Sequence, residues 1–239
     1  SVADLAPIVE QAVRTAPPAL ALLEDGFVPL FNGMDFAGWE GIGSSVVKPD
    51  GILSCASQLR TVRDYTNFVL RFEVRIPPNG NNGIGIRCPV EGDAAYQGMC
   101  ELQVLDNEGS DYKTLKPYQY HGSVYGIVPA VRGHQKPADA WNFEEIRVVG
   151  TRITVLLNGF VITDVDTATI AEPFMDHKAH PGFHNKAGRI GLLGHHPGAV
   201  DYRNLRVKEV AADWVPANEA PCPRGFTRLY DGQDLKGWK

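Results

Sequence analysis

The most constraining feature of the chain is a period-two pattern between Asn67 and Ile76, in which an apolar residue stands at every second position. A period of two residues is typical of a strand with one face in a core and the other in solvent. One face would carry Phe68, Leu70, Phe72, Val74 and Ile76, and the other Val69, Arg71, Glu73 and Arg75. The segment therefore predicts a half-buried strand of a sheet.

Similar short runs follow along the chain, separated by turn residues. Asn158-Gly159, which lies between two of these runs, is a strong signal for a two-residue hairpin. The 239 residues include 25 glycines and 17 prolines, a composition that favours many turns over long helices. The further expected strands are residues 84–88, 99–105, 122–128, 143–149, 153–157, 160–165, 189–193 and 202–210. We therefore expect an all-β fold, a sandwich of two antiparallel sheets.

The two ends of the chain differ from this pattern. Apolar residues recur at helical spacing from Val2 to Val13, so residues 1–24 predict a short N-terminal helix and a linker. Residues 225–239 repeat residues 26–40 with identity at seven of fifteen positions. We therefore expect the sandwich to span 25–210 and residues 211–239 to be a linker and the truncated start of a second copy. The encoded protein would then be longer than this chain.

Charge and composition exclude several classes of protein. The net charge is −5, which argues against non-specific nucleic-acid binding. No apolar stretch is long enough to predict a membrane span, and the first ten residues do not resemble a secretory signal. None of the four cysteines forms a CxxC pair, so a structural zinc site is not expected.

The segment Glu101 to Asp106 holds the densest group of candidate catalytic residues. In an extended strand Glu101 and Gln103 share one face, and a bulge near Leu105 would return Asp106 to that face. Charged groups are costly inside a core, so this face predicts either a solvated surface or a polar cleft. Arg87, by its parity in the neighbouring run, is expected on the same polar face. Cys88 and Cys100 would then both face inward, where a disulfide is one option and free thiols the other.

Histidines and aromatic residues supply further candidates. His121 follows three aromatic or polar residues and is either a core residue or a proton-transfer group, and His195 follows an expected strand. His177, His180 and His184 have spacings that resemble a metal site, but no predicted helix aligns them, so no metal is expected. No GxGxxG, P-loop or GxSxG motif is present, which leaves nucleotide binding and a serine-hydrolase elbow unsupported.

Several stretches together resemble the 3-keto-disaccharide hydrolase family, a bacterial family long described as a domain of unknown function. They occur in order and are 26–39 (GFVPLFNGMDFAGW), 81–87 (NNGIGIR), 95–107 (AYQGMCELQVLDN), 118–129 (YQYHGSVYGIVP), 141–146 (WNFEEI), 157–159 (LNG), 188–195 (GRIGLLGH) and 200–207 (VDYRNLRV). The resemblance implies a concanavalin A-like jelly roll with a carbohydrate site on a concave sheet. It also implies a periplasmic or extracellular location with a removed signal peptide, and no cofactor beyond an optional structural calcium ion.

The resemblance also implies a chemistry. A ketone at C3 of a sugar acidifies the C2 proton, so a base can remove it, the C1 substituent can leave, and water can add. We expect Glu101 or His121 as the base, Arg87 as the group that stabilises the enolate, and Asp106 or His195 as the acid or orienting group. The residues expected to bind the sugar are Gln103, Tyr96, Tyr125, Lys113 and Trp141. The expected partner is a carbohydrate, with no nucleic acid and no membrane span, and the sequence does not determine the oligomeric state.

Two alternative functions remain open from the sequence. The domain could be a non-catalytic, lectin-like carbohydrate-binding module, because a fold alone does not give a function. It could also be a conventional glucanase-type glycosidase, because the spacing of Glu101, Gln103 and Asp106 resembles the catalytic strand of laminarinase-type enzymes. Gln103 stands where those enzymes carry an acid.

Overall fold

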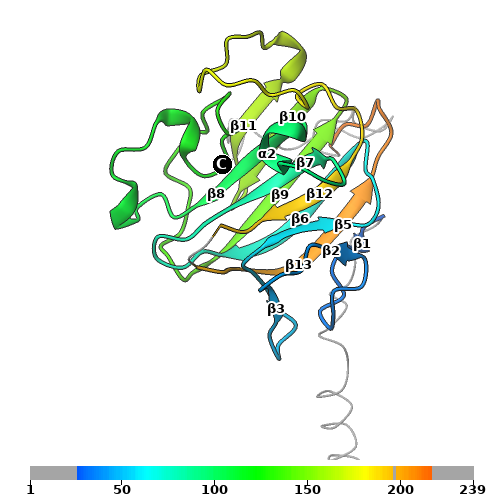
Figure 1. Cartoon of the computed structure of the whole chain (residues 1–239), viewed down its shortest axis with the longest axis vertical. Helices are drawn as coiled ribbons and strands as arrows, with labels where there is room; N and C mark the ends of the chain where they lie inside the picture. The colour runs from blue at the N-terminus through cyan, green and yellow to red at the C-terminus, as the bar shows by residue number, and fades with distance from the viewer. Residues whose placement is uncertain (1–25, 196–197, 217–239) are drawn as a thin grey trace, which may run out of the picture.

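The computed structural model describes residues 26–195 and 198–216, which form a sandwich of two antiparallel sheets (Figure 1). The strands of the eight-stranded sheet are β1 (Val28–Pro29), β3 (Val46–Val47), β4 (Leu53–Cys55), β6 (Phe68–Arg75), β9 (Trp141–Val149), β10 (Arg152–Leu157), β11 (Phe160–Asp166) and β13 (Val200–Glu209). Their order is β11-β10-β9-β6-β13-β4-β3, with β1 paired to β13.

The five-stranded sheet carries the strands that matter most for the candidate site. It contains β2 (Trp39–Glu40), β5 (Gln58–Thr61), β7 (Asn81–Cys88), β8 (Cys100–Leu105) and β12 (Arg189–Leu193), in the order β2-β5-β12-β7-β8. The helical elements are short: α2 (Ala94–Gln97) and the 3₁₀ turns η1 (Ser110–Tyr112), η2 (Pro117–Gln119) and η3 (Thr167–Thr169). The expected all-β sandwich is therefore confirmed.

The core lies between the sheets and follows the alternation in the sequence. In β6 the buried residues are interrupted by half-buried Arg71, Glu73 and Arg75, which point outward. The inner face of β8 contributes Leu102 and Val104, which are fully buried. The long strands of both sheets run in nearly the same direction (Figure 1), as in aligned sheet packing.

The predicted hairpin at Asn158-Gly159 joins β10 to β11. Both residues have positive φ, 52° and 90°, which is the conformation that a type I′ turn requires. The Asn158 side chain also accepts a hydrogen bond from the Phe143 amide at 3.0 Å, so the turn is tied to the neighbouring strand β9.

The expected strand 122–128 differs in the structure. Only residues 122–125 run along β8: Tyr125 N donates to Glu101 O at 2.9 Å, and Gln103 N donates to Ser123 O at 3.0 Å. A turn follows immediately, with Ile127 N donating to Val124 O and Gly126 at φ 77°. The segment therefore covers the outer edge of β8 and then leaves it.

The predictions for the ends of the chain fall largely outside the described residues. The expected N-terminal helix in 1–24 and the repeated segment 225–239 both lie there. The first copy of the repeat is described: Phe31 packs in the core, and the Trp39 indole donates to Leu30 O at 2.9 Å. Among residues 26–195 and 198–216, no helix has the length and apolar character needed to cross a membrane.

Candidate functional site

A cleft of about 320 Å³ opens on the outer face of the five-stranded sheet. Alternate residues of β8 point into it, namely Glu101, Gln103 and Leu105, because Leu102 and Val104 take the core face. The neighbouring strands add Asn81, Gln58 and Leu193. The parity argument from the sequence thus places Glu101 and Gln103 side by side in one cleft.

Gly83, on the strand next to β8, leaves the space that the Glu101 side chain occupies. Gly85, two residues further along the same strand, lies opposite Glu101 in the β7–β8 register. A Cβ on Gly83 would come within 1.9 Å of Glu101 Oε1. The NNGIGIR stretch therefore supplies a floor without side chains, over which the carboxylate lies.

Glu101 and His195 form the charged centre of the cleft. His195 Nε2 lies 3.7 Å from Glu101 Oε1, an ion-pair separation that is longer than a direct hydrogen bond. Oε1 accepts no hydrogen bond from any residue that the structure describes. Burial raises the pKa of Glu101, and His195 opposes this effect. In turn, Glu101 raises the pKa of His195. The neighbouring His196 lies outside the described residues.

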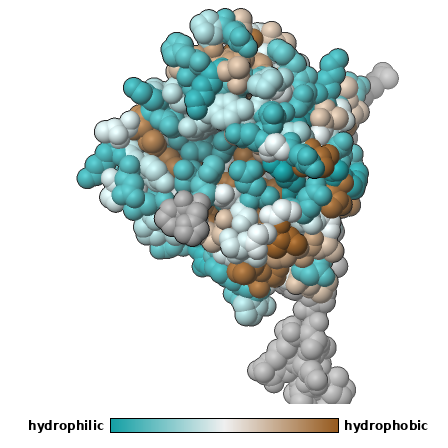
Figure 2. Space-filling view, viewed as in Figure 1, coloured by the Kyte–Doolittle hydropathy of each residue, from teal (hydrophilic) through white to brown (hydrophobic). Residues whose placement is uncertain are grey.

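Aromatic and polar side chains from α2 and the loops form the walls of the cleft. α2 and the residue before it provide Tyr96, Ala95 and Asp93, while the loops after β8 provide Tyr112, Leu115, Gln119 and Tyr125. Asp93 also caps α2, because its carboxylate accepts from Ala95 N at 2.9 Å. The surface on this side of the molecule is mostly hydrophilic, with scattered apolar patches (Figure 2). Flat rings beside amides and carboxylates suit a sugar, which has apolar ring faces and a hydroxylated rim.

The structure does not bring Arg87 into the cleft. The Arg87 backbone has φ 48°. The Arg87 guanidinium donates to Thr66 O at 2.6 Å and to Asn185 O at 3.1 Å. The positive φ breaks the alternation at the end of β7, so the expectation of a shared face with Glu101 is wrong. Arg87 joins loops to the sheet and is not placed to stabilise an enolate.

The same break in alternation separates the two cysteines. Cys100 packs in the core, whereas Cys88 packs with Ala94 and Leu193 under α2. Both are free thiols, as is Cys55, and all three are buried. Burial raises the pKa of Cys88 to about 12. The disulfide considered from the sequence is therefore not formed.

Asp106 does not return to the cleft face. Its carboxylate accepts from Asn79 N at 3.0 Å and from Glu108 N at 3.3 Å. It is therefore committed to the turn before β7 and the turn after β8. The bulge that would have turned it toward Glu101 does not occur.

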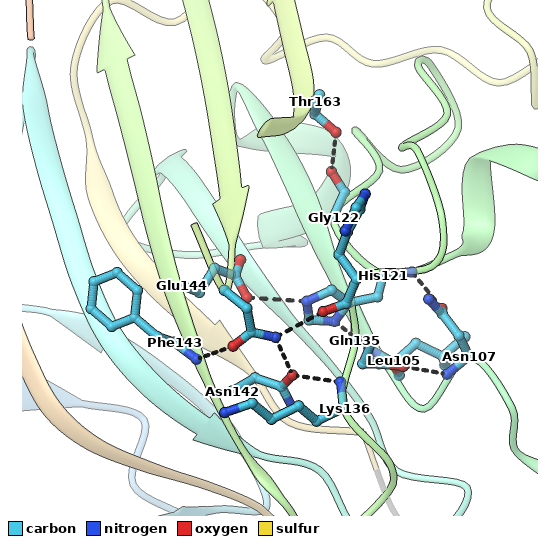
Figure 3. Close-up of polar contacts among 12 residues, drawn as sticks. Leu105, Asn107, His121, Gly122, Gln135, Lys136, Asn142, Phe143, Glu144 and Thr163 are labelled. Atoms are coloured by element: carbon cyan, nitrogen blue, oxygen red, sulfur yellow. Dashed lines mark hydrogen bonds and ion pairs between the residues drawn. The ribbon is translucent and has the colours of Figure 1, made fainter. Parts of the chain in front are cut away.

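His121 lies between the two sheets (Figure 3). Its Nδ1 accepts from Leu105 N at 3.3 Å, and its Nε2 lies 3.2 Å from Glu144 Oε2 on β9. Both side chains are fully buried. His121 is thus a core residue that links the sheets, and the structure does not place it as a base in the cleft.

Two of the expected sugar-binding residues also lie elsewhere. Trp141 is on the outer face of the opposite sheet, where its ring lies 4.9 Å from the Arg75 guanidinium and 4.2 Å from that of Arg203. Lys113 is exposed and does not line the cleft. Tyr96, Tyr125 and Gln103 do line it.

Some residues of the site carry no clear signal in the sequence. Gln58 and Asn81 line the cleft from β5 and β7, and only the outward parity of their strands could have indicated them. Lys178 donates from its Nζ to the Tyr96 hydroxyl at 2.9 Å, from a long irregular loop that no periodicity describes.

Within the described residues, no group of three or more His, Cys, Asp or Glu side chains is arranged to hold a metal ion. His180 instead pairs with Asp176 at 3.0 Å.

Comparison with known families places this geometry in context. Residues 26–208 match the model of the 3-keto-alpha-glucoside-1,2-lyase-like domain. The chain belongs to this family. The matched segment runs from just before β1 into β13 and so includes both sheets and the cleft.

Individual relatives agree with the family. A protein of Bacteroides thetaiotaomicron named 3-keto-disaccharide hydrolase is 28% identical over 228 residues, which cover 77% of this chain and 78% of the relative. A crystal structure from Parabacteroides distasonis, provisionally assigned as a glycosyl hydrolase, has a TM-score of 0.68 at 25% identity and covers 77% of this chain and 99% of its own. The family is therefore one of carbohydrate hydrolases.

A more distant neighbour bears on the fold alone. A Bacillus subtilis protein with a galectin-like fold has a TM-score of 0.51 at 13% identity, covering 77% of this chain and 94% of its own. The jelly-roll class expected from the resemblance is therefore confirmed.

Proposed function

We propose that the protein hydrolyses 3-keto-glycosides, including 3-keto-disaccharides, at the cleft on the five-stranded sheet. The reaction proceeds by removal of the C2 proton, elimination of the C1 substituent and addition of water. The observation that carries this proposal is Glu101, a buried carboxylate that faces a sugar-sized polar cleft and whose Oε1 accepts no hydrogen bond from the described residues. The names of the family and of its Bacteroides relative agree with this chemistry.

Glu101 has the properties of a base for C2. Burial raises its pKa above the ordinary value, which increases the basicity of the carboxylate, and the nearby His195 opposes this rise. No described residue donates a hydrogen bond to Oε1, and His195 Nε2 lies 3.7 Å away, so this oxygen can accept a proton from carbon. We therefore assign the role of the base to Glu101 and not to His121, the other candidate of the sequence analysis.

His195 takes the role of the orienting cation. Its imidazolium balances the carboxylate before the reaction and the developing enolate afterwards, provided that it stays protonated. Glu101 raises the pKa of His195, which favours the protonated form near neutral pH. The amides of Gln103, Asn81 and Gln58 offer further donors to the sugar hydroxyls.

The order of these steps also explains how a family described as lyase-like can include a relative named a hydrolase. Elimination alone gives a lyase, because the C1–O bond breaks while a C1=C2 double bond forms. Addition of water to that double bond returns a proton to C2 and places a hydroxyl on C1. The net result is hydrolysis, and one site that holds both a base and a water can perform both halves.

The two alternatives fit the cleft less well. A lectin-like module would hold its carboxylates in hydrogen bonds, whereas Glu101 Oε1 accepts none from the described residues and lies 3.7 Å from His195 Nε2. A conventional glycosidase needs two carboxylates on either side of the bond. Asp106 is committed to turns, and Asp93 caps α2.

The experiment compares oxidised and unoxidised sugars. The protein is incubated with 3-keto-trehalose, 3-keto-glucosides and the corresponding glucosides, with and without EDTA, and released sugar is quantified. We expect cleavage of the keto forms only, unchanged by EDTA. Cleavage of the unoxidised sugars would indicate a conventional glycosidase, and binding without cleavage would indicate a lectin.

A second measurement isolates the base. C2 hydrogen exchange is followed by NMR in D₂O, using a 3-keto sugar that has no leaving group at C1. We expect exchange with the native chain and a loss of about 10³-fold in Glu101→Gln. Exchange that continues in this variant would remove Glu101 from the mechanism.

The cellular location is a separate part of the proposal. We place the protein in the periplasm or outside the cell, as the family resemblance implies. Fractionation of cells that express the full gene tests this, and recovery with the cytosolic proteins would contradict it.

A further inference from the structure

A phenol–ammonium pair lies at the wall of the cleft, and it joins Tyr96, which the sequence analysis expected only to bind the sugar, to Lys178, which the sequence analysis did not indicate. Tyr96, on α2, lines the cleft. Lys178, on the loop between η3 and β12, donates from Nζ to the Tyr96 hydroxyl at 2.9 Å. The same ammonium lies 4.9 Å from the centre of the Tyr96 ring. Lys178 therefore contacts the one Tyr96 atom that can release a proton.

The tyrosine is held in place from behind. The His180 ring packs against Tyr96 with a centroid distance of 4.8 Å, and His180 Nε2 lies 3.0 Å from Asp176 Oδ2. Gly182 N donates to Tyr96 O at 3.2 Å, so the loop is also tied to the backbone of α2. The ring thus has a fixed position, which is a requirement for a group that transfers a proton.

The electrostatics suit an acid. Burial raises the pKa of Tyr96, and the hydrogen bond from Lys178 opposes this rise. The hydroxyl is therefore protonated at neutral pH. The Lys178 ammonium can stabilise the phenolate once the proton has left. The hydrogen bond with Tyr96 in turn raises the pKa of Lys178, which keeps it charged.

The proposed reaction requires such an acid at C1. Glu101 is occupied with the C2 proton, His195 is paired with Glu101, and Arg87, Asp106 and His121 do not line the cleft. A sugar leaving as an alkoxide is a poor leaving group and needs a proton as the C1–O bond breaks. This need, together with the pair at the cleft wall, points to one role.

We propose that Tyr96 is the catalytic acid that protonates the leaving oxygen, and that Lys178 is the positioning residue that stabilises its phenolate. The inference rests on the proposed function. In the elimination, Glu101 takes the C2 proton, the C–H electron pair forms the C1=C2 bond, the C1–O pair goes to the leaving oxygen, and Tyr96 gives that oxygen its proton. In the hydration, the phenolate takes a proton from the water that adds to C1, and Glu101 returns its proton to C2.

The test compares the native protein with Tyr96→Phe on two substrates that differ in their leaving group. For 3-keto-disaccharides we expect kcat/KM to fall by about 10²–10³-fold, because the leaving alkoxide is not protonated. For 4-nitrophenyl 3-keto-glucoside, whose leaving group is stable as an anion, we expect a loss of less than about tenfold. Tyr120→Phe is the matched control: Tyr120 lies outside the cleft, under the Arg132 guanidinium at 3.9 Å, so this variant should keep both activities.

C2 exchange separates this inference from the proposed function. Tyr96→Phe should retain exchange at C2 while losing cleavage of the disaccharide. The role of Tyr96 would be overturned if Tyr96→Phe lowered kcat/KM equally for the disaccharide and the nitrophenyl glucoside, or for neither. It would also be overturned if C2 exchange fell in parallel with cleavage. Absence of exchange and cleavage in the native chain would instead defeat the proposed function, and the inference with it.

Lys178 is tested by its pH profile. Because the ammonium lowers the pKa of the phenol, Lys178→Ala should move the basic limb of kcat/KM to higher pH and reduce its plateau, and Lys178→Arg should restore part of both. Lys186→Ala removes an exposed lysine from the same loop and serves as the control. A reduced plateau with an unmoved basic limb would show that Lys178 only supports the loop and would overturn its assigned role.

Discussion

At the scale of single residues, the position of one carboxylate depends on the absence of a side chain beside it. Gly83 has no Cβ, and a methyl group there would meet Glu101 Oε1. Because that atom is the end of a flexible side chain, the clash would move the carboxylate and leave the sheet intact. Gly83 is therefore a positioning residue for the base.

We expect Gly83→Ala to lower kcat by about 10²-fold, the loss typical of a displacement of about 1 Å in a catalytic group. KM and the midpoint of thermal unfolding should change little. Gly191→Ala is the control, because a Cβ there would meet the ends of Leu193 and Cys88 and not Glu101. Equal kcat losses in both variants would contradict the argument.

The Glu101–His195 pair predicts a pH dependence. Glu101 must be ionised to accept the C2 proton, so kcat/KM should fall as the pH falls through its pKa. Burial raises that pKa above its ordinary value, so the acid limb should lie above that of an exposed glutamate. In His195→Asn the opposing cation is lost, the pKa of Glu101 rises further, and the limb should move to higher pH. A limb that moves to lower pH, or does not move, would refute the pairing.

At the scale of the elements, the sandwich is linked internally by a polar contact between its sheets. His121 stands on the segment that follows η2 and meets Glu144 on β9, with both side chains fully buried (Figure 3). The pair also holds the start of the segment 122–125 against β8, because His121 Nδ1 accepts from Leu105 N.

A double-mutant cycle measures this link. Glu144→Leu leaves His121 buried without its partner and should cost about 3 kcal/mol of unfolding free energy. His121→Leu combined with Glu144→Leu should cost less than the sum of the single changes, with a coupling of at least about 1 kcal/mol. Urea denaturation of the four proteins provides the values. Simple additivity would show that the two side chains do not interact.

The elements also show how far the sequence alone could lead. Alternation located β6, β9 and β10 because each has one face in the core, and the Asn158-Gly159 hairpin followed from turn chemistry. The same parity placed Glu101 and Gln103 on one face. It failed for Arg87, where a positive φ ends the alternation, and for Asp106, whose carboxylate caps a turn. It could not indicate Lys178, because loops bring residues together without a period.

At the scale of the whole molecule, the outer faces of the two sheets carry different features. The outer face of the five-stranded sheet carries the cleft. The outer face of the eight-stranded sheet carries aromatic rings between guanidinium groups, such as Trp141 between Arg75 and Arg203. The two faces are separated by the full thickness of the core, so a change on one need not affect the chemistry of the other.

Trp141→Ala tests this separation. Loss of two cation–π contacts and of packed ring surface should reduce the free energy of unfolding by about 1–2 kcal/mol. The kcat and KM for a 3-keto-disaccharide should stay within about twofold of the native values, since about 1.4 kcal/mol would be needed for a tenfold change. A large rise in KM would contradict this separation and would support the sugar-binding role that the sequence analysis expected of Trp141.

The strand that carries Glu101 is the last strand of its sheet, and such strands tend to recruit other chains. Here the segment 122–125 pairs with the open side of β8 through Tyr125 N, Gln103 N and Gly122 N. Aggregation through this edge is thereby blocked, and β8 cannot slip in register without breaking these bonds. The amides of Gln103 and Tyr125 should accordingly be among the slowest of the cleft residues to exchange with deuterium, so the catalytic strand lies in one of the most rigid parts of the molecule.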